Sequence, residues 1–501
     1  MLNELRQRVS DEFQRTGKRR RVKLVDSTLR DGHQCLWATR MRTEQMLPLA
    51  QKLDKSGFDC IEAIALVQFD ASVRFLNQDP FERVRLLAER IRDTPLRGAV
   101  RSNLLGGFYP VAEDINALYV ERLIANGISE LWFLDALHCW ENIAPSVAAG
   151  KRLGAKITAP LLRFNSEPGY DVDFYISKTR EALDLFSPDI VNFGDPGGNL
   201  SVDTVRTLIP AIKGVIGDRP LEVQVHCVNA IGPLVALEAA VCGADRLMCS
   251  IEPLANGNAG PSAHMLARNL REIGFEVDVV DEVLDEISDY LASVAAENGF
   301  PVGVPAEYDP SHLLTQYAGG AMTNLQAQLQ DAGIAHQLPA VLDEIARVRV
   351  ELGSPVMSTP FPAMVAGQAV MNVLSGERYK VVPDEIKKYV CGYFGRPPIP
   401  VNEDVKDKVI ANGSKEIALT PPEIPPALPA LRRRYTGLSD DQLLLRYMYG
   451  DDRVDKLVPT RVDDTFSIKN PLSVLVEGLA KLPARRRVHI ASGGVEILAN
   501  G

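Results

Sequence analysis

The chain has 501 residues, of which 46% are hydrophobic and 24% charged, so its composition is that of a folded protein with a large core. A net charge of -10 with a sequence pI near 5.4 argues against a nucleic acid or an anionic membrane as partner. The length exceeds the roughly 100–200 residues of one typical domain, although an α/β barrel alone can reach about 250.

The N-terminus has no secretory leader pattern, and no apolar run of about 18 residues that would span a membrane occurs. The seven cysteines form no C-x-x-C pair, which favours reduced thiols over a disulfide framework or zinc ribbon. We therefore expect a cytoplasmic protein.

Short β-branched runs alternate with amphipathic stretches between Lys23 and Arg271. The predicted strands are Val22–Asp26, Asp59–Ile64, Gly98–Arg101, Leu131–Asp135, Ile157–Arg163, Asp189–Phe193, Leu221–His226 and Arg246–Ile251. Helices are expected between them, for example over Glu44–Lys55, Pro80–Arg92, Asp114–Asn126, Ser201–Lys213 and Leu234–Val241. Eight such units predict an α/β fold of the (β/α)₈ TIM-barrel type, with a doubly wound open sheet as the alternative.

The later chain has a helical pattern, as in Val283–Ala296, Pro339–Leu352 and Ser439–Gly450, with a short strand expected at Arg487–Ile490. Pro421–Pro429 is predicted to be a linker. The expected organisation is an N-terminal arm over residues 1–21, a barrel over 22–275, a mainly helical domain over 276–420, and a linker and tail over 421–501.

Polar residues gather where the predicted strands end, which is where TIM barrels hold their catalytic groups. They are Asp26–Asp31, Glu62, Arg101, Asp135, Asn192–Asp195, His226 and Glu252. Carboxylates, an arginine and a histidine at one rim suggest a site for an oxygen-bound metal or a 2-oxo acid.

The segment DSTLRDGHQCLWATRMRT, which starts at Asp26, resembles the DTTLRDAHQSLLATRMRT opening of a family of carboxyltransferases. These are the carboxyltransferase subunits and domains of biotin-dependent 2-oxo-acid carboxylases, such as pyruvate carboxylase, oxaloacetate decarboxylase and transcarboxylase. The resemblance to this family continues in the segments Phe69–Arg85, Gly319–Gln326 and Gly367–Val401.

The resemblance implies a TIM barrel with a helical funnel domain, a divalent metal at the barrel mouth, and biotin carried on another protein. No lysine lies in the M-K-M-type setting of a biotinyl domain, so biotin is expected only in trans. The implied partners are a biotin carboxyl carrier and a biotin carboxylase, with a homodimer or a hetero-oligomer with a sibling chain as the assembly.

Residue by residue, the resemblance places Asp31 on the metal-binding aspartate and Gln34 and Arg101 on substrate-binding positions. Asp70 and Asp135 fall on catalytic-site carboxylates, and His226 falls on a metal histidine. An arginine such as Arg101 can grip a carboxylate in a bidentate fork; the alternative is a structural ion pair with Asp70 or Asp135.

Several positions depart from the family pattern, among them Ala65-Leu66, which stands for a pair of glycines. Gly194 stands for the metal-bridging carbamylated lysine, Gln224 for a metal histidine, Asn258 for the proton-shuttle threonine on the biotin side, and Phe108 for a substrate-side tyrosine. A divalent ion (Mg, Mn, Co or Zn) is therefore expected to bind weakly. Asp31, Asn192, Gln224 and His226 are predicted either to form a remodelled, weaker site or to be a hydrogen-bonded polar group without metal.

Two functional hypotheses follow. The first is a carboxyltransferase subunit that moves a carboxyl group between carboxybiotin and a small 2-oxo acid such as pyruvate, oxaloacetate or a related acid. The second is a pseudoenzyme, a catalytically degenerate relative with a structural or regulatory role beside an active sibling chain.

Overall fold

The computed structural model describes residues 2–105, 109–318, 320–467, 487–492 and 495–500. Eight parallel strands close into a barrel in sequence order, so the predicted TIM barrel is confirmed and the open-sheet alternative is wrong. The strands are β1 (Lys23–Asp26), β2 (Cys60–Ile64), β3 (Leu96–Arg101), β4 (Glu130–Leu134), β5 (Lys156–Arg163), β6 (Ile190–Asp195), β7 (Leu221–Val225) and β8 (Arg246–Cys249).

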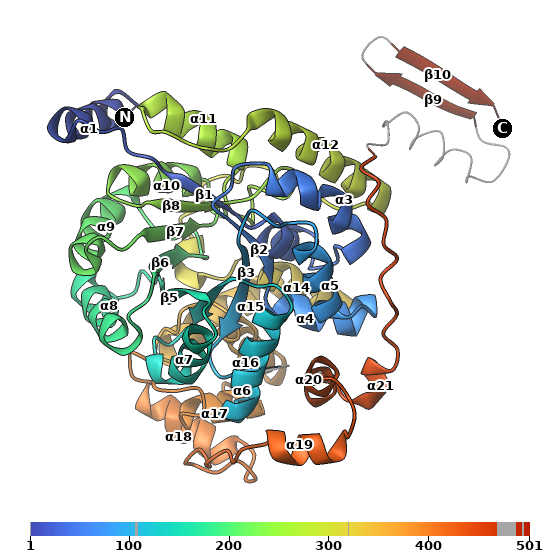
Figure 1. The fold of residues 1–501 in the computed structure, drawn as a ribbon. Helices are drawn as coiled ribbons and strands as arrows, with labels where there is room; N and C mark the ends of the chain where they lie inside the picture. The colour runs from blue at the N-terminus through green and yellow to red at the C-terminus, as the bar shows by residue number, and fades with distance from the viewer. Residues whose placement is uncertain (1, 106–108, 319, 468–486, 493–494, 501) are drawn as a thin grey trace.

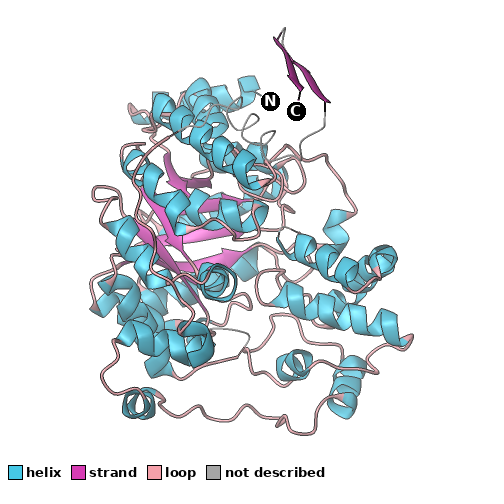
Figure 2. Ribbon diagram, turned by 90° about the vertical axis from the view of Figure 1, so that its right-hand side faces the viewer, coloured by secondary structure: helices cyan, strands magenta, loops and turns pink. Residues whose placement is uncertain are grey.

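Helices surround the barrel and bury the outer face of every strand (Figures 1 and 2). This arrangement explains why the strands read as nearly continuous apolar runs. The helices are α1 (Leu2–Thr16), α2 (His33–Leu36), α3 (Thr43–Asp54), α4 (Leu66–Ala71), α5 (Pro80–Ala88), α6 (Glu113–Ala125), α7 (Ala144–Arg152), α8 (Val172–Phe186), α9 (Val202–Ile216), α10 (Gly232–Val241) and α11 (Ala263–Ile273).

The barrel interior carries a buried network of charges. Arg97 donates to Glu222 at 2.8 Å, and Arg246 donates to Glu130 at 3.1 Å. All four side chains are almost inaccessible to solvent, so each charge depends on its partner. This network fills the barrel beneath the polar groups at the strand ends.

The C-terminal part is mainly helical, as predicted, and half of its helices share a second apolar core. Its elements are α12 (Asp281–Asn298), α13 (His312–Thr315), α14 (Gly320–Asp331), α15 (Leu338–Glu351), α16 (Phe361–Ser375), α17 (Asp384–Val390), α18 (Glu403–Asn412), α19 (Leu428–Arg434), α20 (Asp440–Tyr449), α21 (Asp451–Val454), β9 (Arg487–Ser492) and β10 (Val495–Asn500). The domain boundaries expected from the sequence stay predictions.

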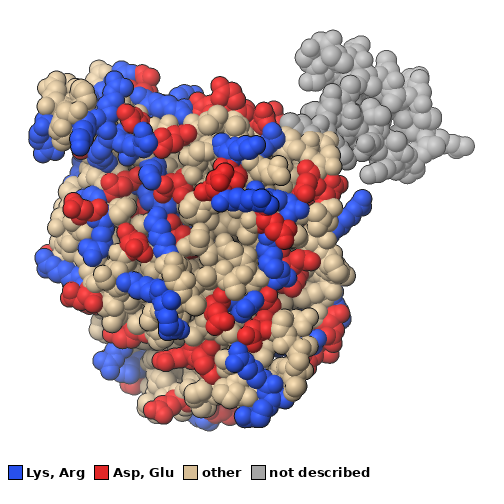
Figure 3. Space-filling view, viewed as in Figure 1, with Lys and Arg blue, Asp and Glu red and all other residues tan. Residues whose placement is uncertain are grey.

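The surface mixes charges of both signs over the face that Figure 3 displays. The basic residues around the start of β1 make contacts with the barrel. Arg20 donates to the carbonyl of Ala244, Arg21 pairs with Glu276, and Lys23 pairs with Asp59. Within the described residues, no helix is both long enough and apolar enough to cross a membrane.

Candidate active site

Asp31 is the centre of the polar group at the barrel mouth. It lies on a π-helical turn, Thr28–Gly32, directly after β1. Its Oδ1 accepts from Arg30 Nη1 at 2.7 Å, and its Oδ2 lies 2.8 Å from His226 Nε2. Burial alone would raise the pKa of Asp31, but Arg30 and His226 hold it below its usual range. An ionised carboxylate only accepts, so His226 is the donor.

Arg30 is fully compensated by carboxylates. Besides Asp31, it donates through Nε and Nη2 to Glu62 Oε2 at 2.9 and 2.5 Å. The other oxygen of Glu62 accepts from the indole of Trp132. Arg30 therefore has little positive charge left to offer a ligand.

Arg163, unlike Arg30, forms no ion pair with a carboxylate among the described residues. Strand pairing places Arg163 beside Gly194, and Gly194 beside Gln224, at the ends of β5, β6 and β7. The guanidinium reaches across Gly194, and its Nη1 donates to Gln224 Oε1 at 2.8 Å. A Cβ atom added at Gly194 would lie 1.8 Å from that Nη1. The guanidinium thus occupies the space that any side chain at position 194 would need.

The backbone of Arg163 is held on both sides. Its N–H donates to His138 Nε2 at 3.0 Å, and its carbonyl accepts from the Tyr175 hydroxyl at 3.1 Å. Burial, together with Lys178 and Arg163, lowers the pKa of His138 to about 3, so its imidazole is neutral and can accept. The end of β5 is therefore fixed before any ligand arrives.

Arg101 lies at the end of β3, half-buried, with Asp70 of α4 facing it. Burial lowers the pKa of Arg101, and Asp70 opposes that effect. Asp70 also lies 3.6 Å from Arg74 Nε. Gln34, on α2, accepts from Gln68 at 3.3 Å. These residues remain candidates for substrate binding.

Both carboxylate oxygens of Asp135 accept hydrogen bonds from nearby loop residues. Oδ1 accepts from the backbone N–H groups of Leu137 and Cys139, and Oδ2 accepts from Ser102 and Asn142. This pattern fixes the loop after β4. It leaves the predicted catalytic role of Asp135 without a feature that supports it.

The remaining predicted residues are spread out. Asn192 lies lower in the barrel, where its amide donates to Glu222 at 2.8 Å. Asn258 is half-buried in the connection between β8 and α11. Phe108 falls outside the described residues.

Family models match both parts of the chain. One described as HMGL-like covers residues 21–289, and a conserved carboxylase domain covers residues 313–493. A pyruvate carboxylase subunit of Methanocaldococcus jannaschii is 34% identical over 406 residues, which are 81% of this chain and 71% of the relative. The chain belongs to the carboxyltransferase family of biotin-dependent carboxylases.

Other relatives of this carboxyltransferase chain have more distant sequences. The methylmalonyl-CoA carboxyltransferase 5S subunit of Propionibacterium freudenreichii subsp. shermanii is 27% identical, over 81% of this chain and 80% of the relative. The carboxyl transferase domain of Rhizobium etli pyruvate carboxylase, solved with pyruvate, matches with a TM-score of 0.79 and 23% identity, over 91% of this chain and 79% of that one. The last comparison supports the fold.

The carboxyltransferase family implies a divalent metal, which needs a set of free donor atoms. Among the described residues, Asp31, Cys35 and His226 bring one ligand atom each within 4.8 Å of one another. Both oxygens of Asp31 already accept, however, from Arg30 and from His226. Burial raises the pKa of the Cys35 thiol well above its usual range, which disfavours the thiolate that a metal requires.

The other predicted ligands are engaged as well. Gln224 Oε1 accepts from Arg163, and Gly194 has no side chain. Asn192 is turned to the lower barrel, where its amide nitrogen donates to Glu222, although its Oδ1 has no partner. Two guanidinium groups, of Arg30 and Arg163, face the carboxylate that would have to hold the ion. The donor set therefore does not fit a divalent cation.

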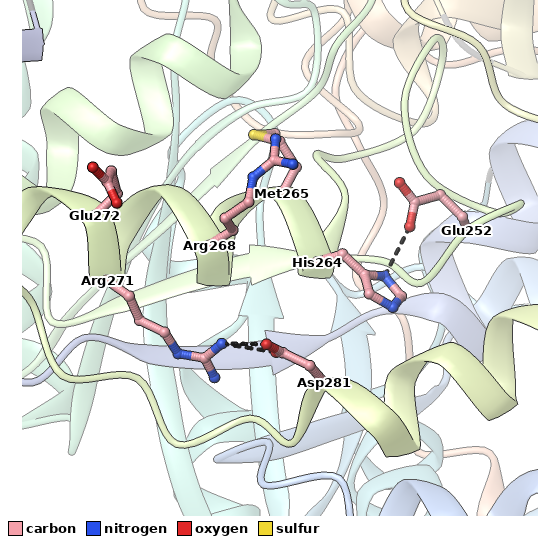
Figure 4. A pocket seen from close by; sticks show the side chains of 7 residues that line it. All are labelled: Glu252, His264, Met265, Arg268, Arg271, Glu272 and Asp281. Atoms are coloured by element: carbon pink, nitrogen blue, oxygen red, sulfur yellow. Dashed lines mark hydrogen bonds and ion pairs between the residues drawn. The ribbon is translucent and has the colours of Figure 1, made fainter.

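Glu252, counted with the strand ends in the sequence, belongs to a separate feature. It lines a groove of about 590 Å³ beside α11 and the start of α12. There its carboxylate lies 2.9 Å from His264 Nδ1, and Arg271 pairs with Asp281 (Figure 4). The groove does not include Asp31, His226 or Arg163.

Two mouth residues were missed from the sequence. Arg163 ends the predicted strand Ile157–Arg163, so the rule that selected the other strand ends also applied to it. Cys35 carried no usable signal, because its nearness to Asp31 and His226 depends on the π-helical turn.

Proposed function

We propose that this chain is a carboxyltransferase subunit that moves a carboxyl group between carboxybiotin and a small 2-oxo acid. The observation that carries the proposal is the set of arginines at the barrel mouth of a chain in this family, Arg101 and Arg163 above all. A 2-oxo acid is an anion, and its enolate carries a second negative charge. Guanidinium groups bind such oxygens with charge-assisted hydrogen bonds.

The proposed reaction is balanced without another reactant. The carbon next to the 2-oxo group loses a proton and bonds to the carboxyl carbon. The N–C bond of carboxybiotin breaks, and the ureido nitrogen receives the proton. In this scheme Arg101 binds the carboxylate of the acid, and Gln34 of α2 orients it. Asn258 would face the ureido group, but an amide does not shuttle protons at neutral pH.

The proposed partners follow from the same chemistry. Carboxybiotin would arrive on a separate carrier, loaded by a biotin carboxylase subunit, and the chain would assemble as a homodimer or with a sibling carboxyltransferase chain. Any Mg²⁺, Mn²⁺, Co²⁺ or Zn²⁺ at the mouth would be held weakly. The carrier, the biotin carboxylase and this chain must share one compartment, and we propose that it is the cytoplasm.

The test is biotin-dependent decarboxylation of oxaloacetate by the purified chain, with free biotin as acceptor and pyruvate as the measured product. We expect turnover by the wild type, and a roughly 10- to 100-fold loss of kcat/KM in Arg101→Gln, because one charge-assisted contact is removed. Arg180→Gln, an exposed position, is the matched control.

A specific observation favours the second candidate, an inactive partner of a sibling chain. The lysine, histidine and threonine positions implied by the resemblance hold Gly194, Gln224 and Asn258. Absence of any biotin-dependent turnover, combined with capture of a sibling carboxyltransferase chain, would support that candidate and contradict the first.

A further inference from the structure

Arg163 is a buried cation that makes no ion-pair contact among the described residues, and the carboxylates of Asp31, Glu62 and Glu222 act on it only from a greater distance. The residue is 3% exposed, and among the described residues no carboxylate oxygen lies within 4.0 Å of its guanidinium nitrogens. Its one recorded side-chain hydrogen bond goes to the neutral amide of Gln224. Burying a guanidinium is costly unless an anion compensates it, and the Asp31 carboxylate that faces Arg163 is already engaged by Arg30 and His226, so an anionic ligand would complete the compensation.

Unsatisfied polar atoms remain on residues of the mouth. Among the donors, Arg163 Nε is buried without a hydrogen-bond partner. Arg83, another buried arginine outside ion pairs, also has an unpartnered nitrogen, Nη1, but it donates to three groups, Thr43, Gln78 and the carbonyl of Met41. Arg163 therefore has fewer protein partners than a comparably buried arginine of the same barrel.

The geometry around Arg163 is built into the strand register. The glycine between Arg163 and Gln224 leaves the space through which the guanidinium crosses β6, and His138 and Tyr175 fix the backbone from which it extends. A fixed positive charge needs no reorganisation when a ligand's negative charge appears. The same charge repels a divalent cation from the Asp31–His226 pair.

We propose that Arg163 and Gln224 form an anion-binding site that holds an oxygen of the 2-oxo acid or of its enolate, so that a guanidinium replaces the divalent ion. The identity of the ligand rests on the proposed function; the requirement for an anion does not. Arg163 supplies the positive charge, and Gln224 orients it.

The experiment measures equilibrium binding of oxalate to the purified full chain by calorimetry, in buffer with a chelator. Oxalate has the two adjacent oxyanions of a 2-oxo-acid enolate and undergoes no turnover. The wild type is expected to bind it without metal. Arg163→Gln should weaken binding by at least about 10-fold, through loss of the charge-assisted contact.

Gly194→Ala is the second variant, and it leaves Arg163 in place. Its added Cβ would lie 1.8 Å from Arg163 Nη1, so the guanidinium must move and oxalate binding should weaken by a similar factor. Gly214→Ala makes the same chemical change at an exposed position of α9, where no atom lies within 4 Å of the added Cβ. This variant should bind oxalate as the wild type does. If Arg163→Gln fails to fold, Gly194→Ala still decides the matter.

Two results would overturn the proposal. One is oxalate binding by the wild type only after a divalent metal is added; the other is unchanged binding in folded Arg163→Gln or Gly194→Ala. Failure of the proposed function looks different. In that case oxalate binds through Arg163, yet oxaloacetate is not decarboxylated with biotin.

Discussion

At the scale of single residues, the mouth depends on a relation between a glycine and an arginine. Gly194 provides no ligand, but the missing Cβ leaves room for Arg163 to reach Gln224. Neither residue is informative alone. Together they place the Arg163 guanidinium where the family resemblance implies a ligand for a metal ion.

Asp26 gives a test of the electrostatics beneath the mouth. It is completely buried, and it accepts from the backbone and hydroxyl of Thr28, while its Oδ2 has no partner. Burial raises the pKa of Asp26 to about 7 from an ordinary 3.8. Because the folded pKa lies above the unfolded one, ionisation destabilises the fold increasingly between pH 4 and 7, by about 4 kcal/mol at most.

Asp26→Asn should therefore be more stable than the wild type at pH 8, and the difference in unfolding free energy should shrink toward pH 4. Urea denaturation at several pH values measures it, with exposed Asp218→Asn as the control that shows no such trend. A difference that stays constant over this pH range would contradict the burial argument.

The candidate residues show what a sequence can and cannot reveal. Asp31 and His226 were predicted together, and they lie 2.8 Å apart, because both follow strand ends of a closed barrel. Asp135 was predicted for the same reason; its oxygens fix a loop, and its catalytic role stays a prediction. Side-chain partners depend on loop conformation, which periodicity does not encode.

At the scale of elements, the end of β5 is the piece that positions Arg163. The hydroxyl of Tyr175 on α8 donates to the Arg163 carbonyl and accepts from the Asn165 N–H at 2.9 Å. Burial raises the pKa of Tyr175 well above its usual range, so the hydroxyl keeps its proton. This contact ties strand, loop and helix at one point.

Tyr175→Phe removes both hydrogen bonds and leaves a buried N–H and C=O without them. We expect the unfolding free energy to fall by about 1–3 kcal/mol and oxalate binding to weaken. Denaturant titration and calorimetry measure these effects. Tyr393→Phe, which loses an exposed bond to the Ala418 carbonyl, is the control and should change neither. Equal behaviour of the two variants would refute the positioning role.

Helix α20 is joined to the barrel by Asp441. Its oxygens accept from Arg122 at 2.7 Å, from Arg85 at 2.8 Å and from Asn126 at 3.1 Å. Sequence periodicity predicted this helix within one residue at each end, but not the surface against which it packs. That surface depends on which barrel helices lie side by side, α5 and α6 in this case.

Asp441→Asn should weaken this contact by about 1–3 kcal/mol, since charge-assisted bonds become neutral ones. Hydrogen exchange of the α20 amides is expected to accelerate, while the exchange of β-strand amides stays unchanged. Asp440→Asn is the neighbouring control, because Asp440 bonds only the exposed Arg432 among the described residues. Acceleration in both variants alike would indicate a general effect of charge at the helix start.

At the scale of the whole molecule, a barrel with a charged interior supports a mouth at the strand ends. All eight strands were predicted to within about two residues at either end, because a parallel barrel buries both strand faces and leaves unmistakable apolar runs. The network around Arg97 and Glu222 was not predicted. Its members alternate with apolar residues, and only barrel closure brings them together.

The most direct measurement is a crystal structure of the purified chain soaked with oxalate and Mn²⁺, with anomalous data collected for manganese. We predict oxalate bound to the Arg163 guanidinium, and no anomalous peak between Asp31 and His226. A full-occupancy manganese peak at that pair, with Arg163 moved away from Gly194, would contradict the replacement of the ion by a guanidinium.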